Sequence, residues 1–106
     1  MIINIEIEKL STATKGAIAE LCVATDLMKK GYAVFRALSP NCFCDLVVYK
    51  DGISFYIEVR TGYESKLTKK LGGFGILRQG ATCFGIYERN SGQIYYYNEK
   101  KEIVKL

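Results

Sequence analysis

Three charged residues have the types and spacing needed for metal-dependent chemistry on an anionic substrate. Asp45 precedes one β-branched run, and Glu58 and Arg60 alternate with apolar residues in the next run. Strand residues two apart point to the same face, so Glu58 and Arg60 share one surface. The carboxylates offer oxygens to a hard divalent cation, and the guanidinium offers positive charge to a phosphate. By itself, this alternation is more often the solvated face of an amphipathic strand.

A predicted β-hairpin positions these three residues. Asp51 and Gly52 follow Lys50 and separate two runs rich in β-branched and aromatic residues. Asp-Gly between such runs is a strong hairpin signal. We therefore expect antiparallel strands at 45–50 and 53–60, which bring the Asp45 carboxylate beside that of Glu58.

The remaining elements predict an α/β fold with a central mixed β-sheet flanked by helices. Residues 15–30 form a helical pattern that Gly31 closes, and a short basic helix is expected at 63–71, after Thr61 and Gly62 end the second hairpin strand. Further strands are expected at 32–38, 82–88 and 93–97, and the last two should pair as a second hairpin over Asn90, Ser91 and Gly92.

Glu20 lies in the middle of the first predicted helix, among apolar residues. A bare carboxylate is costly to bury without a partner. Glu20 therefore either points to solvent along a narrow polar stripe or faces the sheet and shares in a site. We favour the second interpretation.

Length and composition favour a single domain spanning residues 1–106. The chain has 49% hydrophobic and 25% charged residues, which is ordinary for a globular protein. It has no apolar run of the roughly 20 residues that a membrane helix needs, and its N-terminus lacks an export signal. We expect a cytoplasmic protein with no membrane partner.

The placement of charge predicts a polyanionic partner. The formal net charge is +4, and the segment 60–80 alone has five basic residues against the single acid Glu64. A local basic stripe beside a carboxylate pair is typical of proteins that bind polyanions. The alternative is a solvated helix or loop face.

The four cysteines give little support to a zinc site. Cys42 and Cys44 are separated by one residue, and the chain has no histidine. Structural zinc sites usually have two to four residues between paired ligands. We expect free thiols that are mostly buried.

Several motifs between Lys15 and Tyr97 together resemble the PD-(D/E)XK nuclease superfamily, which has the restriction-endonuclease-like fold. The small Holliday-junction-resolvase-like and short PD-(D/E)XK endonucleases are the most similar members. The matching segments are Lys15-Gly-Ala-Ile-Ala-Glu20, Gly31-Tyr-Ala-Val-Phe-Arg36, Ser39, Asp45-Leu-Val-Val and Glu58-Val-Arg-Thr-Gly62.

The chain departs from the family pattern at two positions. Cys44 stands where the family name records a proline, and Arg60 stands where it records the lysine. Arginine keeps the positive charge and can hold a phosphate bidentately, but it is effectively never deprotonated. Catalysis is therefore retained, weakened or lost.

The resemblance implies a Mg²⁺- or Mn²⁺-dependent DNA endonuclease that hydrolyses phosphodiester bonds, including those of branched or junction DNA. It implies metal ligation by Asp45, Glu58 and the Val59 carbonyl, with Glu20 completing the site and Arg60 steadying the phosphate. Cutting two strands suggests a homodimer or a higher homo-oligomer. The alternative is an inactive DNA-binding or assembly subunit with the same fold. The residues expected to contact DNA are Lys15, Arg36, Ser39, Lys66, Lys69, Lys70 and Arg78.

Overall fold

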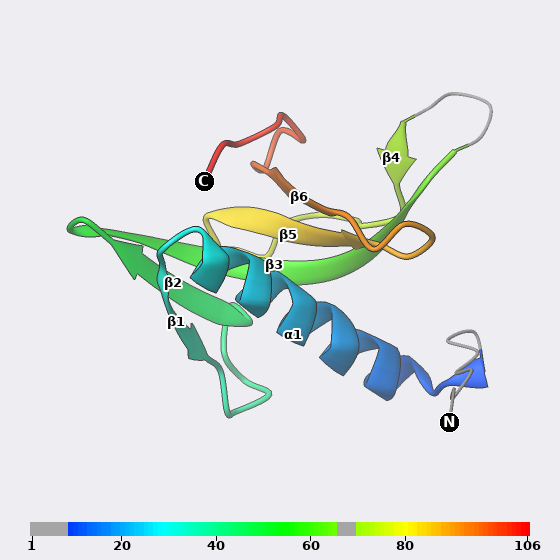
Figure 1. Cartoon of the computed structure of the whole chain (residues 1–106), viewed down its shortest axis with the longest axis horizontal. Helices are drawn as coiled ribbons and strands as arrows, with labels where there is room; N and C mark the ends of the chain where they lie inside the picture. Colours follow the sequence, from blue (N-terminus) through cyan, green and yellow to red (C-terminus); the bar gives the residue numbers. More distant parts are fainter. Residues whose placement is uncertain (1–8, 66–69) are drawn as a thin grey trace.

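The computed structural model describes residues 9–65 and 70–106, which form one helix packed on a six-stranded mixed sheet (Figure 1). The strand order is β1-β2-β3-β5-β6, and β4 pairs with β3 outside this path. β3 and β5 are parallel, whereas the other pairs are antiparallel. The elements are α1 (Thr12–Lys29), β1 (Ala33–Arg36), β2 (Leu46–Lys50), β3 (Ile53–Glu64), β4 (Leu71–Gly72), β5 (Cys83–Glu88) and β6 (Ile94–Tyr97).

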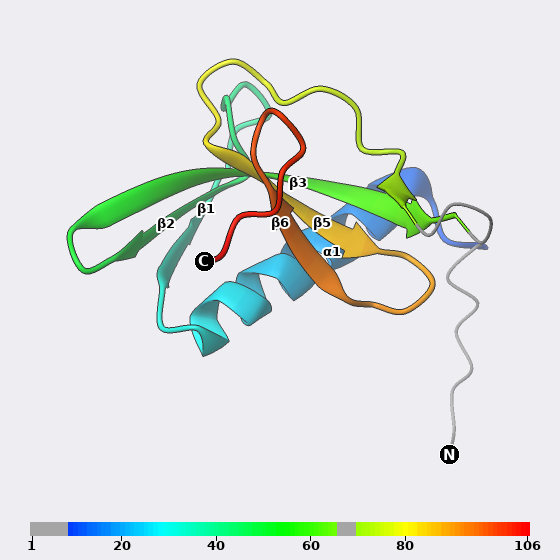
Figure 2. The ribbon, with the colours of Figure 1, turned by 90° about the horizontal axis from the view of Figure 1, so that it is seen from above.

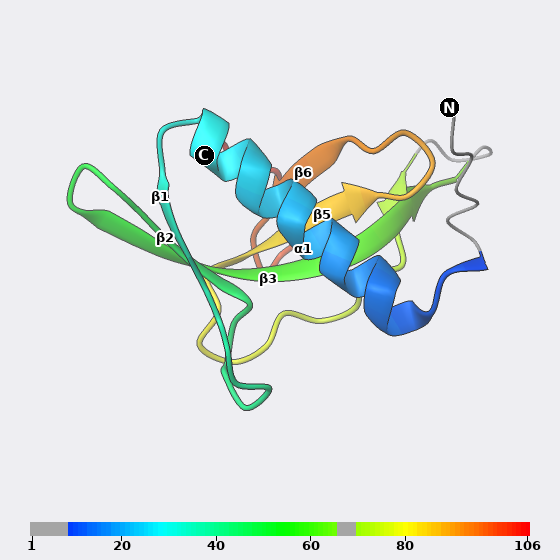
Figure 3. The same cartoon turned by 60° about the horizontal axis from the view of Figure 1, so that its bottom comes forward.

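Helix α1 covers one face of the sheet (Figure 3). Its N-cap is Ser11, whose hydroxyl accepts a hydrogen bond from the Thr14 amide at 3.2 Å. Gly31, with φ +92°, follows its C-terminus in the left-handed conformation that glycine favours. Among the described residues, no helix has the length and hydropathy needed to cross a membrane.

The close approach of α1 to the sheet depends on a glycine in β5. Val23 of α1 is fully buried, and a Cβ added at Gly85 would lie 2.8 Å from its Cγ1. The same core contains Leu27 of the helix and Ile57 of β3. The helix therefore packs directly on β3, next to the strand segment that carries Glu58.

The opposite face is covered by a loop rather than by a second helix. Figure 2 shows the segment after β4 crossing the sheet away from α1, and its Phe74 packs with Phe84 and Ile86. The prediction of flanking helices is wrong, because α1 is the only helix in 9–65 and 70–106. The predicted basic helix 63–71 is also wrong at its ends, which belong to β3 and β4; its residues 66–69 lie outside the described part of the chain.

The predicted hairpins are confirmed. β2 and β3 are antiparallel, and their turn residues Asp51 and Gly52 have φ of 52° and 81°, which suits the tight turns that twisted hairpins prefer. β5 and β6 form the second antiparallel pair. The first hairpin fixes the register that positions the candidate site.

Candidate active site

The carboxylates of Asp45 and Glu58 meet where β2 begins. Leu46 pairs with Ile57, so the preceding Asp45 stands opposite Glu58. The Asp45 amide donates to the Ile57 carbonyl at 2.9 Å, and Asp45 Oδ2 accepts from the Val59 amide at 2.7 Å. Backbone hydrogen bonds therefore hold the Asp45 carboxylate against the strand that carries Glu58.

Glu58 is fully buried, with 0% of its surface exposed. Its Oε1 accepts a hydrogen bond from the Arg78 amide at 2.7 Å. Its Oε2 contacts Arg60 Nη2 as an ion pair, but within the described residues this oxygen has no partner with hydrogen-bond geometry. A buried charge of this kind is costly unless cations compensate it.

Arg78 is the second cation at Glu58, and it also contacts Asp45. Its Nη2 lies 3.1 Å from Asp45 Oδ2 and its Nε lies 3.2 Å from Glu58 Oε1, while its Nη1 donates to the Cys42 carbonyl at 3.2 Å. Burial disfavours the charged guanidinium, but the neighbouring carboxylates of Asp45 and Glu58 outweigh it and raise the pKa of Arg78. One guanidinium therefore bridges the two carboxylates.

Glu20 faces the same region from α1. Its Oε1 forms an ion pair with Arg36 Nε of β1 at 2.8 Å. Both residues line a cleft of about 250 Å³ together with Asp45 and Arg78. The fold thus brings Glu20 to the cleft, where Arg36 rather than Arg60 or Arg78 is its partner.

The other predicted site residues are only partly gathered at this cleft. Ser39 lines it, and its hydroxyl accepts from the Asn41 amide at 3.2 Å. Lys15 lies in the first turn of α1, and Lys70 is exposed just before β4. Lys66 and Lys69 lie outside the described residues.

The donor set suits a divalent cation that needs few protein ligands. Within 9–65 and 70–106, no cluster of three or more His, Cys, Asp or Glu side chains is arranged to hold a metal ion. Mg²⁺, however, is usually bound through one or two carboxylates, with water and substrate phosphate completing its shell. Asp45 and Glu58 provide such a pair. The arginines that pair with them, Arg60 and Arg78, are positively charged, as a metal ion would be.

Cys44, which lines the cleft, and Cys83 of β5 have raised pKa values and stay protonated at neutral pH. Burial, with a further contribution from the Asp45 charge, raises the pKa of Cys44. Burial also raises the pKa of Cys83 to about 12. Metal ligation by cysteine requires the thiolate, so these two residues are poor ligands at neutral pH.

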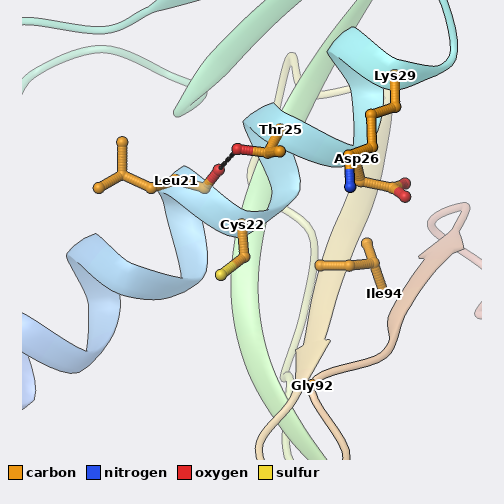
Figure 4. Close-up of a pocket in the computed structure, with 7 residues that line it drawn as sticks. All are labelled: Leu21, Cys22, Thr25, Asp26, Lys29, Gly92 and Ile94. Atoms are coloured by element: carbon orange, nitrogen blue, oxygen red, sulfur yellow. Dashed lines mark hydrogen bonds between the residues drawn. The ribbon is translucent and has the colours of Figure 1, made fainter. Parts of the chain in front are cut away.

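A second cavity, of about 350 Å³, lies between α1 and the β5–β6 hairpin (Figure 4). Its hydroxyl and carboxylate already have partners, because Thr25 Oγ1 donates to the Leu21 carbonyl at 2.8 Å and Asp26 Oδ2 accepts from Tyr96 at 2.6 Å. It does not gather a set of reactive groups comparable to that of the first cleft. The lining residues are Leu21, Cys22, Thr25, Asp26, Lys29, Gly92 and Ile94.

The role of Arg78 at the carboxylates is the feature that sequence reasoning missed. We expected Arg78 to contact DNA, and its pairing with Asp45 and Glu58 was not anticipated. A signal was present, since carboxylates gathered at one strand end need cations, and Arg78 is the only basic residue between Gly72 and Gly80.

Comparisons with known proteins give a match at the level of fold. No model of a protein family matches the sequence, and no curated protein is similar to it. The structure is similar to that of a bacterial homing endonuclease, I-Ssp6803I, with a TM-score of 0.68 and 19% sequence identity. The match covers 86% of this chain and 71% of that chain. The prediction of an endonuclease-like α/β fold is thereby confirmed.

Proposed function

We propose that this chain is a DNA endonuclease that depends on a divalent metal, Mg²⁺ or Mn²⁺. The observation that carries the proposal is the convergence of Asp45 and the fully buried Glu58 on one cationic group, 3.1 and 3.2 Å away. Carboxylate pairs beside cations are suited to phosphodiester hydrolysis. The endonuclease-like fold supports the same reaction class.

In this proposal Asp45 and Glu58 would hold the metal, the Val59 carbonyl would be a further ligand, and Glu20 would complete the site. The metal would supply an activated water and neutralise the leaving oxygen. The Val59 amide keeps Asp45 oriented through its 2.7 Å hydrogen bond. Arg60, which contacts Glu58, lies beside the carboxylates and steadies the phosphate.

The DNA would lie over the cleft. Arg36 and Ser39 line the cleft, so they are suited to contact the DNA backbone there. We propose that residues 1–106 form one nuclease domain. This domain would act on duplex or branched DNA as a homodimer or a higher oligomer. The remaining proposed DNA contacts are Lys15, Lys66, Lys69, Lys70 and Arg78.

The test is cleavage of linear and branched DNA with Mg²⁺ and Mn²⁺. We expect weak cleavage by the native protein, a loss of at least about 100-fold in Asp45→Ala and Glu58→Ala, and equal or faster cleavage by Arg60→Lys. Glu99→Ala, which removes an exposed carboxylate in the turn after β6, is the matched control and should cleave normally. Equal cleavage by Asp45→Ala and the native protein would reject the assigned site.

A second candidate function is a DNA-binding subunit without activity. The observation that favours it is the neutralisation of both carboxylates by Arg60 and Arg78. This candidate replaces the first if neither the native protein nor Arg60→Lys cuts any substrate while salt-dependent DNA binding persists.

A further inference from the structure

We propose that Arg78 competes with the divalent metal for Asp45 and Glu58, so that the metal binds only when this side chain swings away. The inference rests on the proposed function, because it concerns the metal site assigned there. Arg78 reaches both carboxylates from the loop that precedes β5, with its Nη2 on Asp45 and its Nε on Glu58. An internal cation therefore stands between the two groups that would otherwise hold the metal.

The guanidinium and the metal exclude one another for two reasons. Mg²⁺ requires oxygens at roughly 2.0–2.1 Å in near-octahedral geometry. Arg78 contacts Asp45 Oδ2 and Glu58 Oε1 from the space between them. The two cations would also repel each other at this short range.

The Arg78 side chain has a route out of this position. It is 36% exposed and borders the cleft of about 250 Å³, which is large enough to receive it. Its backbone amide can keep the 2.7 Å hydrogen bond to Glu58 while the side chain rotates. The exchange therefore needs a change of rotamer and no rearrangement of the sheet.

Arg60 does not have the same effect. It contacts Glu58 at Oε2, whereas Arg78 contacts Oε1 and also Asp45. Arg60 can therefore remain beside one oxygen while the metal takes the side between the two carboxylates. The competition is specific to the residue that bridges them.

The test measures metal binding rather than cleavage. Mn²⁺ binding, followed by electron paramagnetic resonance, should be about tenfold tighter in Arg78→Gln than in the native protein, since a charge-assisted contact no longer has to be broken. Arg89→Gln is the matched control, because it removes the same charge from an arginine that lies over the Tyr63 ring at 5.0 Å. This control should bind Mn²⁺ as the native protein does.

A measurement on the native protein keeps the test independent of how the variant folds. During a Mg²⁺ titration, the nuclear magnetic resonance signal of the Arg78 Nε–H should shift toward that of a solvent-exposed guanidinium. The signal of Arg89, which lies over the Tyr63 ring, serves as an internal reference. Metal binding with an unchanged Arg78 signal would overturn the competition.

The outcomes separate this inference from the proposed function. Equal Mn²⁺ affinity in the native protein and Arg78→Gln, with binding abolished by Asp45→Ala, rejects the competition and leaves the metal site in place. If neither protein binds Mn²⁺ or Mg²⁺, both proposals fail. Tighter binding in Arg78→Gln together with a moving Arg78 signal supports the competition.

Discussion

Glu58 and Glu88 are both buried acids on the adjacent strands β3 and β5, with 0% and 3% of their surface exposed. Their carboxylates are stabilised by different kinds of partner. Glu58 is neutralised by the side chains of Arg60 and Arg78. Glu88 is held by its own turn, through the amides of Asn90 and Ser91 and the Ser91 hydroxyl, at 2.8 to 3.2 Å.

The difference shows which of the two carboxylates can exchange its partners. The donors on Glu88 are neutral, and most are backbone groups two or three residues away, so they cannot leave without unfolding the turn. The bridging partner of Glu58 is a long side chain twenty residues away that also borders a cleft. Glu88 is therefore a structural carboxylate, whereas Glu58 has the exchangeable environment expected of a functional one.

The largest expected effect is on the stability of the Glu58 pair. Among the described residues, Arg78→Ala leaves Arg60 as the one cationic side chain on the buried Glu58 carboxylate, although the backbone amide of residue 78 still donates to it. The change should cost about 2 kcal/mol of unfolding free energy, below the roughly 3–5 kcal/mol for a fully buried pair, because Arg78 is partly exposed. The double variant Arg78→Ala/Glu58→Gln should recover most of this loss. Urea denaturation measures both values.

A comparison with the other glutamate sharpens this result. Ser91→Ala removes one hydroxyl donor from Glu88 and should cost only about 1 kcal/mol, because the backbone donors remain. If Arg78→Ala costs no more than Ser91→Ala, or the double variant recovers nothing, the ion pair does not compensate Glu58 as argued.

The next effect concerns the response of the two carboxylates to metal. Under the proposed function, Mg²⁺ at ten times its dissociation constant should stabilise the native protein by about 1.4 kcal/mol. Glu88→Gln should keep this increment and Glu58→Gln should lose it. Thermal unfolding at matched ionic strength, with KCl as the control salt, measures the shift. An increment retained in Glu58→Gln would place the metal elsewhere.

The local features of the fold could be predicted from the sequence because short-range chemistry determines them. The Asp51-Gly52 turn requires positive φ at both residues, which glycine adopts readily. Alternation places Glu58 and Arg60 on one face, and their ion pair bears this out.

The end of β3 could not be predicted in the same way. Thr61-Gly62 resembles a strand end, but β3 continues to Glu64. Gly62 is required for close packing, since a Cβ there would lie 2.9 Å from Ile86 Cγ2 and 3.0 Å from the Gly72 carbonyl. Those neighbours come from β5 and β4, so no local pattern reveals them.

The cation between Asp45 and Glu58 is likewise a long-range feature. Alternation and turn signals extend over a few residues, whereas Arg78 is separated from Glu58 by a loop that crosses the sheet. The sequence predicted which carboxylates would meet. Which arginine neutralises them depends on how that loop returns to the sheet.

The smallest effect is the pH dependence of the structural carboxylate. Burial alone would raise the pKa of Glu88, but hydrogen bonds from Ser91 and Asn90 outweigh it and hold the pKa below its ordinary value. A lowered pKa in the folded state contributes stability above the unfolded pKa of about 4.3, and that contribution is lost as the pH falls through the folded value. Glu88→Gln should therefore cost about 1 kcal/mol at pH 7 and progressively less below about pH 4, as urea denaturation at each pH would measure. A cost that stays constant between pH 7 and pH 3 would mean that the Glu88 charge is not what the turn stabilises.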